Sequence, residues 1–179
     1  MIGAPRISPG RRADIGPLNS VIVGIAGRAV GGRAPNVFTT LARHRRLFRA
    51  WLRFAGRLMP FGTLPRKDTE LVILRVSDNC GCAYERDHHE RMGRRAGMTD
   101  EEIARVAVGP DAPGWTPRQL ALLRATDELH ATRTLGDETW AALRSELDER
   151  GAIEFCLLVG HYEMLAMTLN ALRVQIDPR

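Results

Sequence analysis

The spacing of apolar residues predicts helices along almost the whole chain. In residues 36–59, apolar side chains recur at i, i+4, i+7 and i+11, at Leu47, Trp51, Phe54 and Leu58. This spacing is typical of the buried stripe of an amphipathic helix. No segment alternates apolar and polar residues over the length of a strand, so we expect an all-helical fold.

Capping residues and helix breakers set the predicted boundaries. Thr99 followed by Glu102 forms a capping-box pattern, and Thr116-Pro117 is a second helix start. Asn79 and Gly81 both tolerate a left-handed turn, which predicts a break there. The predicted helices span residues 36–59 with a break near 43–46, 66–79, 82–96, 99–107, 117–131, 137–150 and 152–174, with Gly151 between the last two.

The first 35 residues differ from the rest of the chain. Residues 1–35 are rich in Pro, Gly and Arg, which predicts an extended arm with a short helix near residues 18–29. The apolar residues of this arm have no obvious partner within the chain, so we expect part of it to pack on another subunit; they are Ile15, Leu18, Val21, Ile22 and Val23. Residues 36–179 are predicted to form a single helical domain.

The composition is that of an ordinary globular protein. The chain has 179 residues, of which 44% are hydrophobic and 26% charged. The apolar runs are too short to span a bilayer, and the N-terminal segment has no signal-peptide core, so we expect a cytoplasmic protein without a membrane partner. Three cysteines do not suggest a disulfide framework, which makes any function of these thiols reactive rather than structural.

The net charge of +5 comes from arginine, because Lys67 is the only lysine. Six arginines between residues 43 and 57 resemble a nucleic-acid-binding surface, but they fall largely opposite the apolar stripe of the same helix. No nucleic-acid-binding motif accompanies them. We therefore interpret them as a solvated helix face and expect no nucleic-acid partner.

The stretch "NCGCAYERDHHERMGRRAG", residues 79–97, concentrates the candidate chemistry. On a helix, Cys82, Glu85 and His89 share one face at i, i+3 and i+7, and Glu85 can touch His89, while His88 points away. Cys82 falls in the first turn, where the helix dipole favours a thiolate. The nearby Glu85 opposes a thiolate, so a buried cysteine that serves only as a small apolar side chain stays equally open.

These residues also resemble a known family. Glu70, then Cys82-Ala-Tyr84-Glu85 and His88-His89, followed by "RRAGMTDEEIARV", is similar to the carboxymuconolactone decarboxylase family, which includes the alkylhydroperoxidase D-like proteins. The resemblance covers roughly residues 36–175. It implies a compact helical domain, and it implies a homo-oligomer, as a dimer, trimer or hexamer.

The peroxidase branch of that family has the motif C-x-x-C-x-x-x-H and an upstream glutamate. The resemblance matches Cys82 to the first cysteine, Glu85 to the second, His89 to the histidine and Glu70 to the glutamate, and it places Tyr84 where a histidine often stands. Because Glu85 cannot form a disulfide, the usual two-cysteine cycle is not available. A transient Cys80–Cys82 disulfide would close a small, strained ring.

A metal site is a further alternative. Cys80, Cys82, Glu85, His88 and His89 are all potential ligands, and Glu85 with His89 is the pair best placed to share one ion. Their spacing is not that of a standard zinc site, and the two histidines diverge on a helix. We expect no metal and no cofactor.

The leading hypothesis is a cofactor-independent enzyme that carries out acid–base chemistry on a small organic acid or lactone. His89 would move protons, assisted by Glu85 and Glu70, with Cys82 as a pocket thiol. Tyr84, His88 and His161 are candidate substrate contacts, although His161 also fits a buried histidine with satisfied hydrogen bonds. Arg75 and Arg86 are alternatives for holding an anionic group. The competing hypotheses are a thiol-dependent peroxidase that uses Cys82 and a non-catalytic helical oligomer that binds a ligand.

Overall fold

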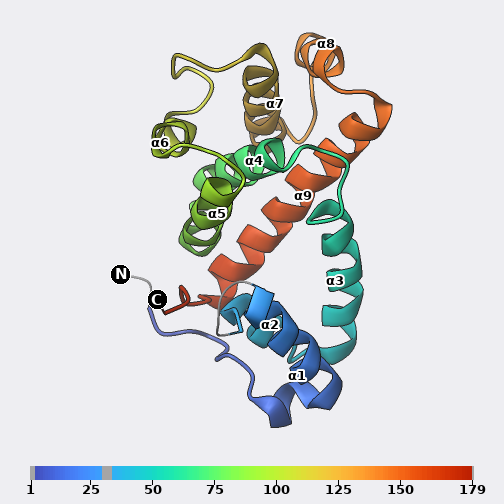
Figure 1. Ribbon diagram of the computed structural model, residues 1–179, viewed down its shortest axis with the longest axis vertical. Helices are drawn as coiled ribbons and strands as arrows, with labels where there is room; N and C mark the ends of the chain where they lie inside the picture. Colours follow the sequence, from blue (N-terminus) through green and yellow to red (C-terminus); the bar gives the residue numbers. More distant parts are fainter. Residues whose placement is uncertain (1–2, 30–33, 179) are drawn as a thin grey trace. The chain divides into compact units, whose positions relative to one another are not determined.

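The computed structural model describes residues 3–29 and 34–178, and over these residues every regular element is an α-helix (Figure 1). This confirms the predicted fold class. The helices are α1 (Arg12–Ala29), α2 (Asn36–Leu41), α3 (Arg45–Leu58), α4 (Arg66–Asn79), α5 (Ala83–Arg95), α6 (Asp100–Val108), α7 (Pro117–Thr132), α8 (Asp137–Glu146) and α9 (Glu149–Leu172).

The helices divide into two compact units. One unit comprises Met1–Arg57 together with Thr168–Arg179, and the other comprises Leu58–Met167. The sequence placed a boundary after residue 35, whereas the chain divides at residues 57 and 167. Contacts between the two ends of the chain are the reason that the first unit includes the C-terminal segment.

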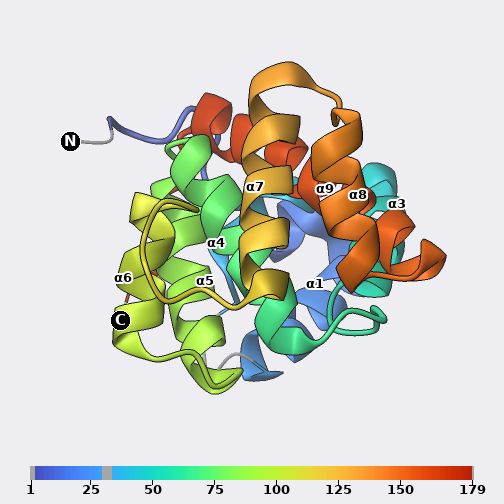
Figure 2. The same cartoon turned by 90° about the horizontal axis from the view of Figure 1, so that it is seen from above.

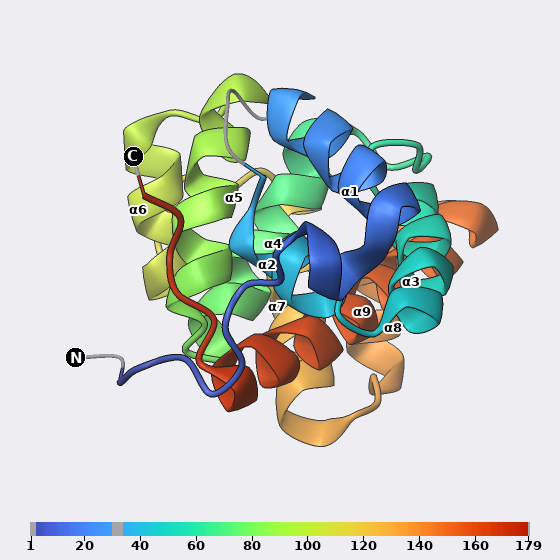
Figure 3. The same ribbon diagram turned by 90° about the horizontal axis from the view of Figure 1, so that it is seen from below.

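The unit that contains both ends has its own small core. Ile15 and Val23 of α1 pack with Ala42 and Phe48, and the rings of Phe38, Phe48 and Trp51 adjoin one another. The N-terminal and C-terminal segments run side by side (Figure 3), and the Arg6 backbone N–H donates to the Leu172 carbonyl at 3.0 Å.

The structure corrects the predicted arm. The helix begins at Arg12 rather than near residue 18, and Ile15 and Val23 have partners within the chain. The opposite side of α1 stays exposed: Leu18, Val21 and Ile25 lie at i, i+3 and i+7 and are each more than half exposed. Packing of this exposed side on another subunit stays a prediction.

The apolar stripe of α3 also differs from its prediction. Leu47 and Phe54 are exposed, while Phe48 is buried together with Leu58. Phe48 therefore takes the place of its neighbour Leu47 at the start of the buried stripe, because the rings of Phe38 and Trp51 pack against Phe48. The arginines at 45, 46, 53 and 57 are exposed, as the interpretation of a solvated face expects.

The second unit is built around α4. This helix packs against α5, α6 and α7, and α7 packs against α8 (Figure 2). Eight of the residues of α4 are buried, from Thr69 to Ser77, which agrees with the predicted buried helix. The capping boxes at Thr99 and Thr116 are both present, the second with Gln119 as its partner.

The long helix α9 begins before Gly151, which the sequence had placed between two helices. Gly151 lies inside the first turn, and its backbone N–H donates to the Asp148 carboxylate at 2.8 Å. By length and composition alone α9 could cross a membrane. The core helix of a soluble protein has the same features, and Phe155, Leu158 and Ala166 of α9 are buried within the chain.

Candidate active site

The turn between α4 and α5 sets the position of the candidate thiol. Cys80 is the C-cap of α4, Gly81 has a positive φ of 57°, and Cys82 is the N-cap of α5. Glycine adopts this backbone conformation without steric cost. The Cys82 backbone N–H donates to the Ser77 carbonyl at 2.8 Å, which fixes the turn. The predicted break is confirmed at Gly81, whereas Asn79 remains the last residue of α4.

The structure buries all four residues that the sequence selected as catalytic. Cys82, Glu85 and His89 come from α5, Glu70 comes from α4, and none of the four is more than 4% exposed. Burial of two carboxyl groups, an imidazole and a thiol has a large free-energy cost unless they pair or change protonation state. Such groups are therefore candidates for function.

Glu70 is the carboxylate that positions His89. Its Oε2 atom lies 2.7 Å from Nδ1 of His89, and its Oε1 atom lies 2.7 Å from the guanidinium of Arg66 at the first turn of α4. The arginine compensates the buried negative charge. When the imidazole is neutral, a carboxylate at Nδ1 favours the tautomer that carries its proton on that nitrogen, and Nε2 is then the proton acceptor.

Glu85 does not pair with His89, contrary to the contact that the i, i+4 spacing predicted. Neither of its carboxyl oxygens has a hydrogen-bond partner at conventional distance. Burial raises the pKa of Glu85 to about 8, partly offset by an interaction with the Cys82 thiol. At neutral pH this side chain is therefore mostly a neutral carboxylic acid, which can donate a proton.

Cys82 is a thiol rather than a thiolate at neutral pH. Burial, followed by the negative charge of Glu85, raises its pKa to about 12, although the Glu85 backbone N–H acts in the opposite direction. The first turn of α5 does favour the anion, as the sequence predicted. Desolvation is the larger effect, and it decides the protonation state.

Tyr162 on α9 completes the cluster, and the sequence analysis gave it no role. Its ring meets His89 edge-to-face with centroids 5.1 Å apart. Burial raises the pKa of Tyr162 well above its ordinary value, and the charges of Glu70 and Glu85 raise it further. Its hydroxyl donates to the sulfur of Met59 at 3.7 Å. The only signal in the sequence was its place beside His161 in an apolar helix.

The three predicted substrate contacts surround the cluster at different depths. His161 packs edge-to-face on Tyr162 at 5.2 Å, and burial lowers its pKa to about 4, so it is neutral at pH 7. Tyr84 is buried and stacks on His88 at 6.3 Å. His88 is only half-buried, so it is less enclosed than His89.

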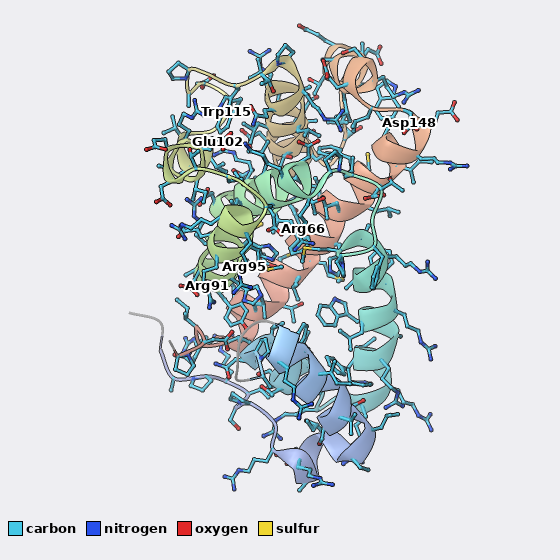
Figure 4. All side chains as sticks on the ribbon, in the orientation of Figure 1. Arg66, Arg91, Arg95, Glu102, Trp115 and Asp148 are labelled. Carbon is cyan, nitrogen blue, oxygen red and sulfur yellow. The ribbon has the colours of Figure 1, made fainter. Side chains whose placement is uncertain are left out.

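The two arginines considered as anion-binding groups form ion pairs within the fold instead. Arg75 makes a two-point contact with Asp127, at 2.6 and 2.8 Å, and donates to the Val106 carbonyl. Arg86 pairs with Asp78 and with Glu90. Arg91 and Arg95 on α5 are exposed (Figure 4). Arg66 is the arginine that contacts a predicted catalytic residue.

The raised pKa of Glu85 predicts a pH dependence of stability. Its pKa rises from 4.5 in the unfolded chain to about 8, so the folded state binds an extra proton between these values. The corresponding stability is fully present below pH 4.5 and is lost as the pH rises to 8, by about 3–5 kcal/mol at most. Glu85→Gln mimics the protonated acid and should abolish this loss, measured by urea denaturation across pH 5–9.

His161 acts in the opposite direction at lower pH, since its depressed pKa makes stability rise between pH 4 and 6.5. The clearest window for Glu85 is therefore pH 6.5–8, and both proteins share the His161 effect. An equal slope for wild type and Glu85→Gln in that window would contradict a protonated Glu85.

A buried Cys–Glu–His cluster at the start of α5, faced by a glutamate of the preceding helix, is the arrangement that the sequence resemblance implied. Residues 45–128 match the carboxymuconolactone decarboxylase family. The uncharacterised protein YdfG of Bacillus subtilis is 25% identical over 99 residues, which are 54% of this chain and 67% of YdfG.

Solved structures share the fold at low sequence identity. An uncharacterised peroxidase-related protein from Ralstonia eutropha, with an alkylhydroperoxidase AhpD core, superposes with a TM-score of 0.87 at 21% identity, over 98% of this chain and 93% of its own. The debrominase Bmp8 superposes with a TM-score of 0.78 at 18% identity, over 96% and 91%. A cysteine-to-alanine variant of Bmp8 was solved in complex with 2,3,4-tribromopyrrole.

Proposed function

We propose that this protein is a cofactor-independent enzyme that transfers protons on a small organic acid or lactone. The observation that carries the proposal is that a proton donor and a proton acceptor lie in the same buried cluster. Glu85 holds a proton at neutral pH because of its raised pKa, while Glu70 orients His89 so that Nε2 is basic. Groups whose environments separate their protonation states in this way are the usual acid and base of an enzyme.

The two groups have complementary tasks in the proposed reaction. In a decarboxylation, the C–C bond breaks and its electron pair passes into the conjugated carbonyl of the substrate as CO₂ leaves. Glu85 then gives its proton to the carbon, and the resulting carboxylate recovers a proton from water. In an isomerisation, His89 Nε2 removes a proton from one carbon, Glu85 gives its proton to another carbon of the same conjugated system, and proton exchange with water restores both side chains. Each positioned group typically contributes about 10²–10⁴-fold to the rate.

Thiol chemistry at Cys82 is the second candidate, and the debrominase neighbour favours it. That protein shares the fold, and its complex with a brominated pyrrole was obtained with a cysteine variant. A peroxidase or a reductive dehalogenase would need the Cys82 thiolate, which the raised pKa opposes. Glu85 would have to accept the thiol proton for either reaction to begin.

Solvent-deuterium incorporation tests the proposal without a known substrate. Carboxymuconolactone and a panel of small keto acids and lactone acids are incubated with the protein in deuterated water and followed by proton NMR. We expect exchange or CO₂ release with at least one compound, lost in His89→Ala. Peroxide consumption or bromide release that depends on Cys82, with no proton exchange on any compound, would favour the thiol reaction instead.

We further propose that the chain assembles with itself through the exposed side of α1, and that it acts in the cytoplasm. Leu18, Val21 and Ile25 form an apolar row that is more than half exposed on this helix. Burial of such a row stabilises a complex by removing apolar surface from water.

Charged substitutions in this row test the assembly. Leu18→Glu and Val21→Glu should reduce the oligomer size measured by light scattering, because an interface then buries an unpaired charge. Val108→Glu is the matched control, since Val108 is an equally exposed apolar residue on α6. An unchanged oligomer in the α1 variants, or a monomeric wild type, would rule out this surface.

A further inference from the structure

A second group of potential ligands lies outside the acid–base cluster. Cys80, at the end of α4, lies beside His130 of α7 and Glu163 of α9. The Cys80 sulfur, one ring nitrogen of His130 and one carboxylate oxygen of Glu163 are all within 4.8 Å of one another. Cys80 directly follows α4, and the other two side chains come from α7 and α9, so the fold rather than local sequence brings them together.

We propose that Cys80, His130 and Glu163 bind a divalent transition-metal ion of the zinc class. Thiolate, imidazole and carboxylate are the three side-chain ligand types that zinc uses in proteins. In a tetrahedral site, ligand atoms lie about 3.3–3.6 Å apart, given the usual metal–ligand distances. The ligand atoms lie within 4.8 Å of one another, and His130 Nδ1 and Glu163 Oε1 are 2.6 Å apart, so small rotations of these side chains would bring them to that spacing.

The hydrogen bonds of the group fit this assignment. His130 Nδ1 lies 2.6 Å from Glu163 Oε1, so the two atoms face each other and a metal ion would replace the hydrogen bond between them. Arg133 donates to the other oxygen, Oε2, at 2.6 Å. Such outer contacts typically orient ligating carboxylates. Arg133 has a positive φ of 66° at the end of α7, a turn that accompanies this contact.

The partial exposure of the group leaves room for a fourth ligand. The His130 side chain is 35% exposed, so water or a small molecule can reach the ion. Cys80 and Glu163 supply two negative charges that balance a divalent cation once the thiol has lost its proton. Three protein ligands with an open position are typical of zinc sites that bind an exchangeable molecule.

This site differs from the metal site weighed from the sequence. That alternative relied on Glu85 and His89, but Glu70 binds His89. The inference also departs from the expectation that the chain binds no metal. His130 and Glu163 had no role in the sequence analysis, because they are 50 and 83 residues from Cys80 and only tertiary packing brings them to it.

Cobalt titration of the metal-free, full-length protein tests the proposal. Co²⁺ added to chelator-treated wild type should bind one equivalent and give the thiolate-to-cobalt charge-transfer absorption, which Zn²⁺ then displaces. Loss of an outer-shell contact typically weakens metal binding about 10–100-fold, so Cys80→Ser and His130→Ala should lose at least that much. Cys156→Ser is the matched control, because Cys156 is also a half-buried cysteine but lies outside the group.

Circular dichroism of the metal-free variants checks that each one folds, and Cys80→Ala and His130→Asn replace any variant that does not. Absence of a charge-transfer band in wild type would overturn the proposal. So would a band that survives in both Cys80→Ser and His130→Ala, or one that is lost only in Cys82→Ser.

Discussion

Replacing His89 by alanine is expected to reduce turnover by about 10²–10⁴-fold, the range typical for loss of a positioned acid or base. His89 is the residue whose ring Glu70 orients, and no other imidazole lies on the same line of α5. Cys82→Ser should keep measurable turnover, because a hydroxyl occupies nearly the same volume as the thiol. Steady-state rates of the two variants, on whichever compound the deuterium assay identifies, give the comparison.

The reverse order of the two variants would support thiol chemistry. If Cys82→Ser were inactive while His89→Ala retained much of its rate, the sulfur would be the reacting atom. His44→Ala is a suitable control, because His44 is exposed and lies before α3, outside the cluster. Its turnover should match that of wild type.

Replacing Glu70 by alanine is expected to affect both stability and activity. The change leaves Arg66 and His89 without the carboxylate that lies 2.7 Å from each. Because the Arg66 side chain is 37% exposed, the loss should be that of a hydrogen bond to a charged group, about 1.5–3 kcal/mol of stability. Turnover should also fall, because Nδ1 of His89 no longer has a partner that fixes the tautomer. Urea denaturation and steady-state kinetics on the same preparations measure the two effects.

Two comparisons make the Glu70 result specific. Asp100→Ala removes a carboxylate that pairs with Arg94 at 2.7 Å on the exposed first turn of α6, and it should leave turnover unchanged. Glu70→Gln retains the shape and one hydrogen bond to His89, so it should be the less damaging of the two Glu70 variants. A Glu70→Ala protein with wild-type pH–rate profile would show that Glu70 does not act through His89.

Local sequence signals predicted the helices well. Capping residues at Thr99 and Thr116 and the glycine turn at Gly81 act over a few residues, so sequence alone could locate them. Gly151 was wrong as a boundary because glycine is tolerated within a helix, and Asp148 accepts its N–H. The predicted stripe of α3 was partly wrong, because packing between helices, rather than periodicity, decided that Phe48 is buried and Leu47 is exposed.

Only the part of the candidate site that lies on a single helix could be predicted from the sequence. The face shared by Cys82, Glu85 and His89 follows from helical periodicity, and the resemblance added Glu70. The partner of His89 could not be chosen from spacing, since Glu85 at i, i+4 was a plausible contact and Glu70 lies 19 residues away. Tyr162 was missed for the same reason, because its contact with His89 exists only in the folded chain.

The protonation state of Glu85 tests the acid–base account most directly, and it needs no substrate. In protein labelled with ¹³C-glutamate, the carboxyl resonance of Glu85 is identified by its absence from Glu85→Gln and followed from pH 4 to pH 10. The account predicts a protonated carboxyl at pH 7 and a midpoint near the raised pKa of about 8. A midpoint near the ordinary value of a glutamate, with the group ionised at pH 7, would contradict it.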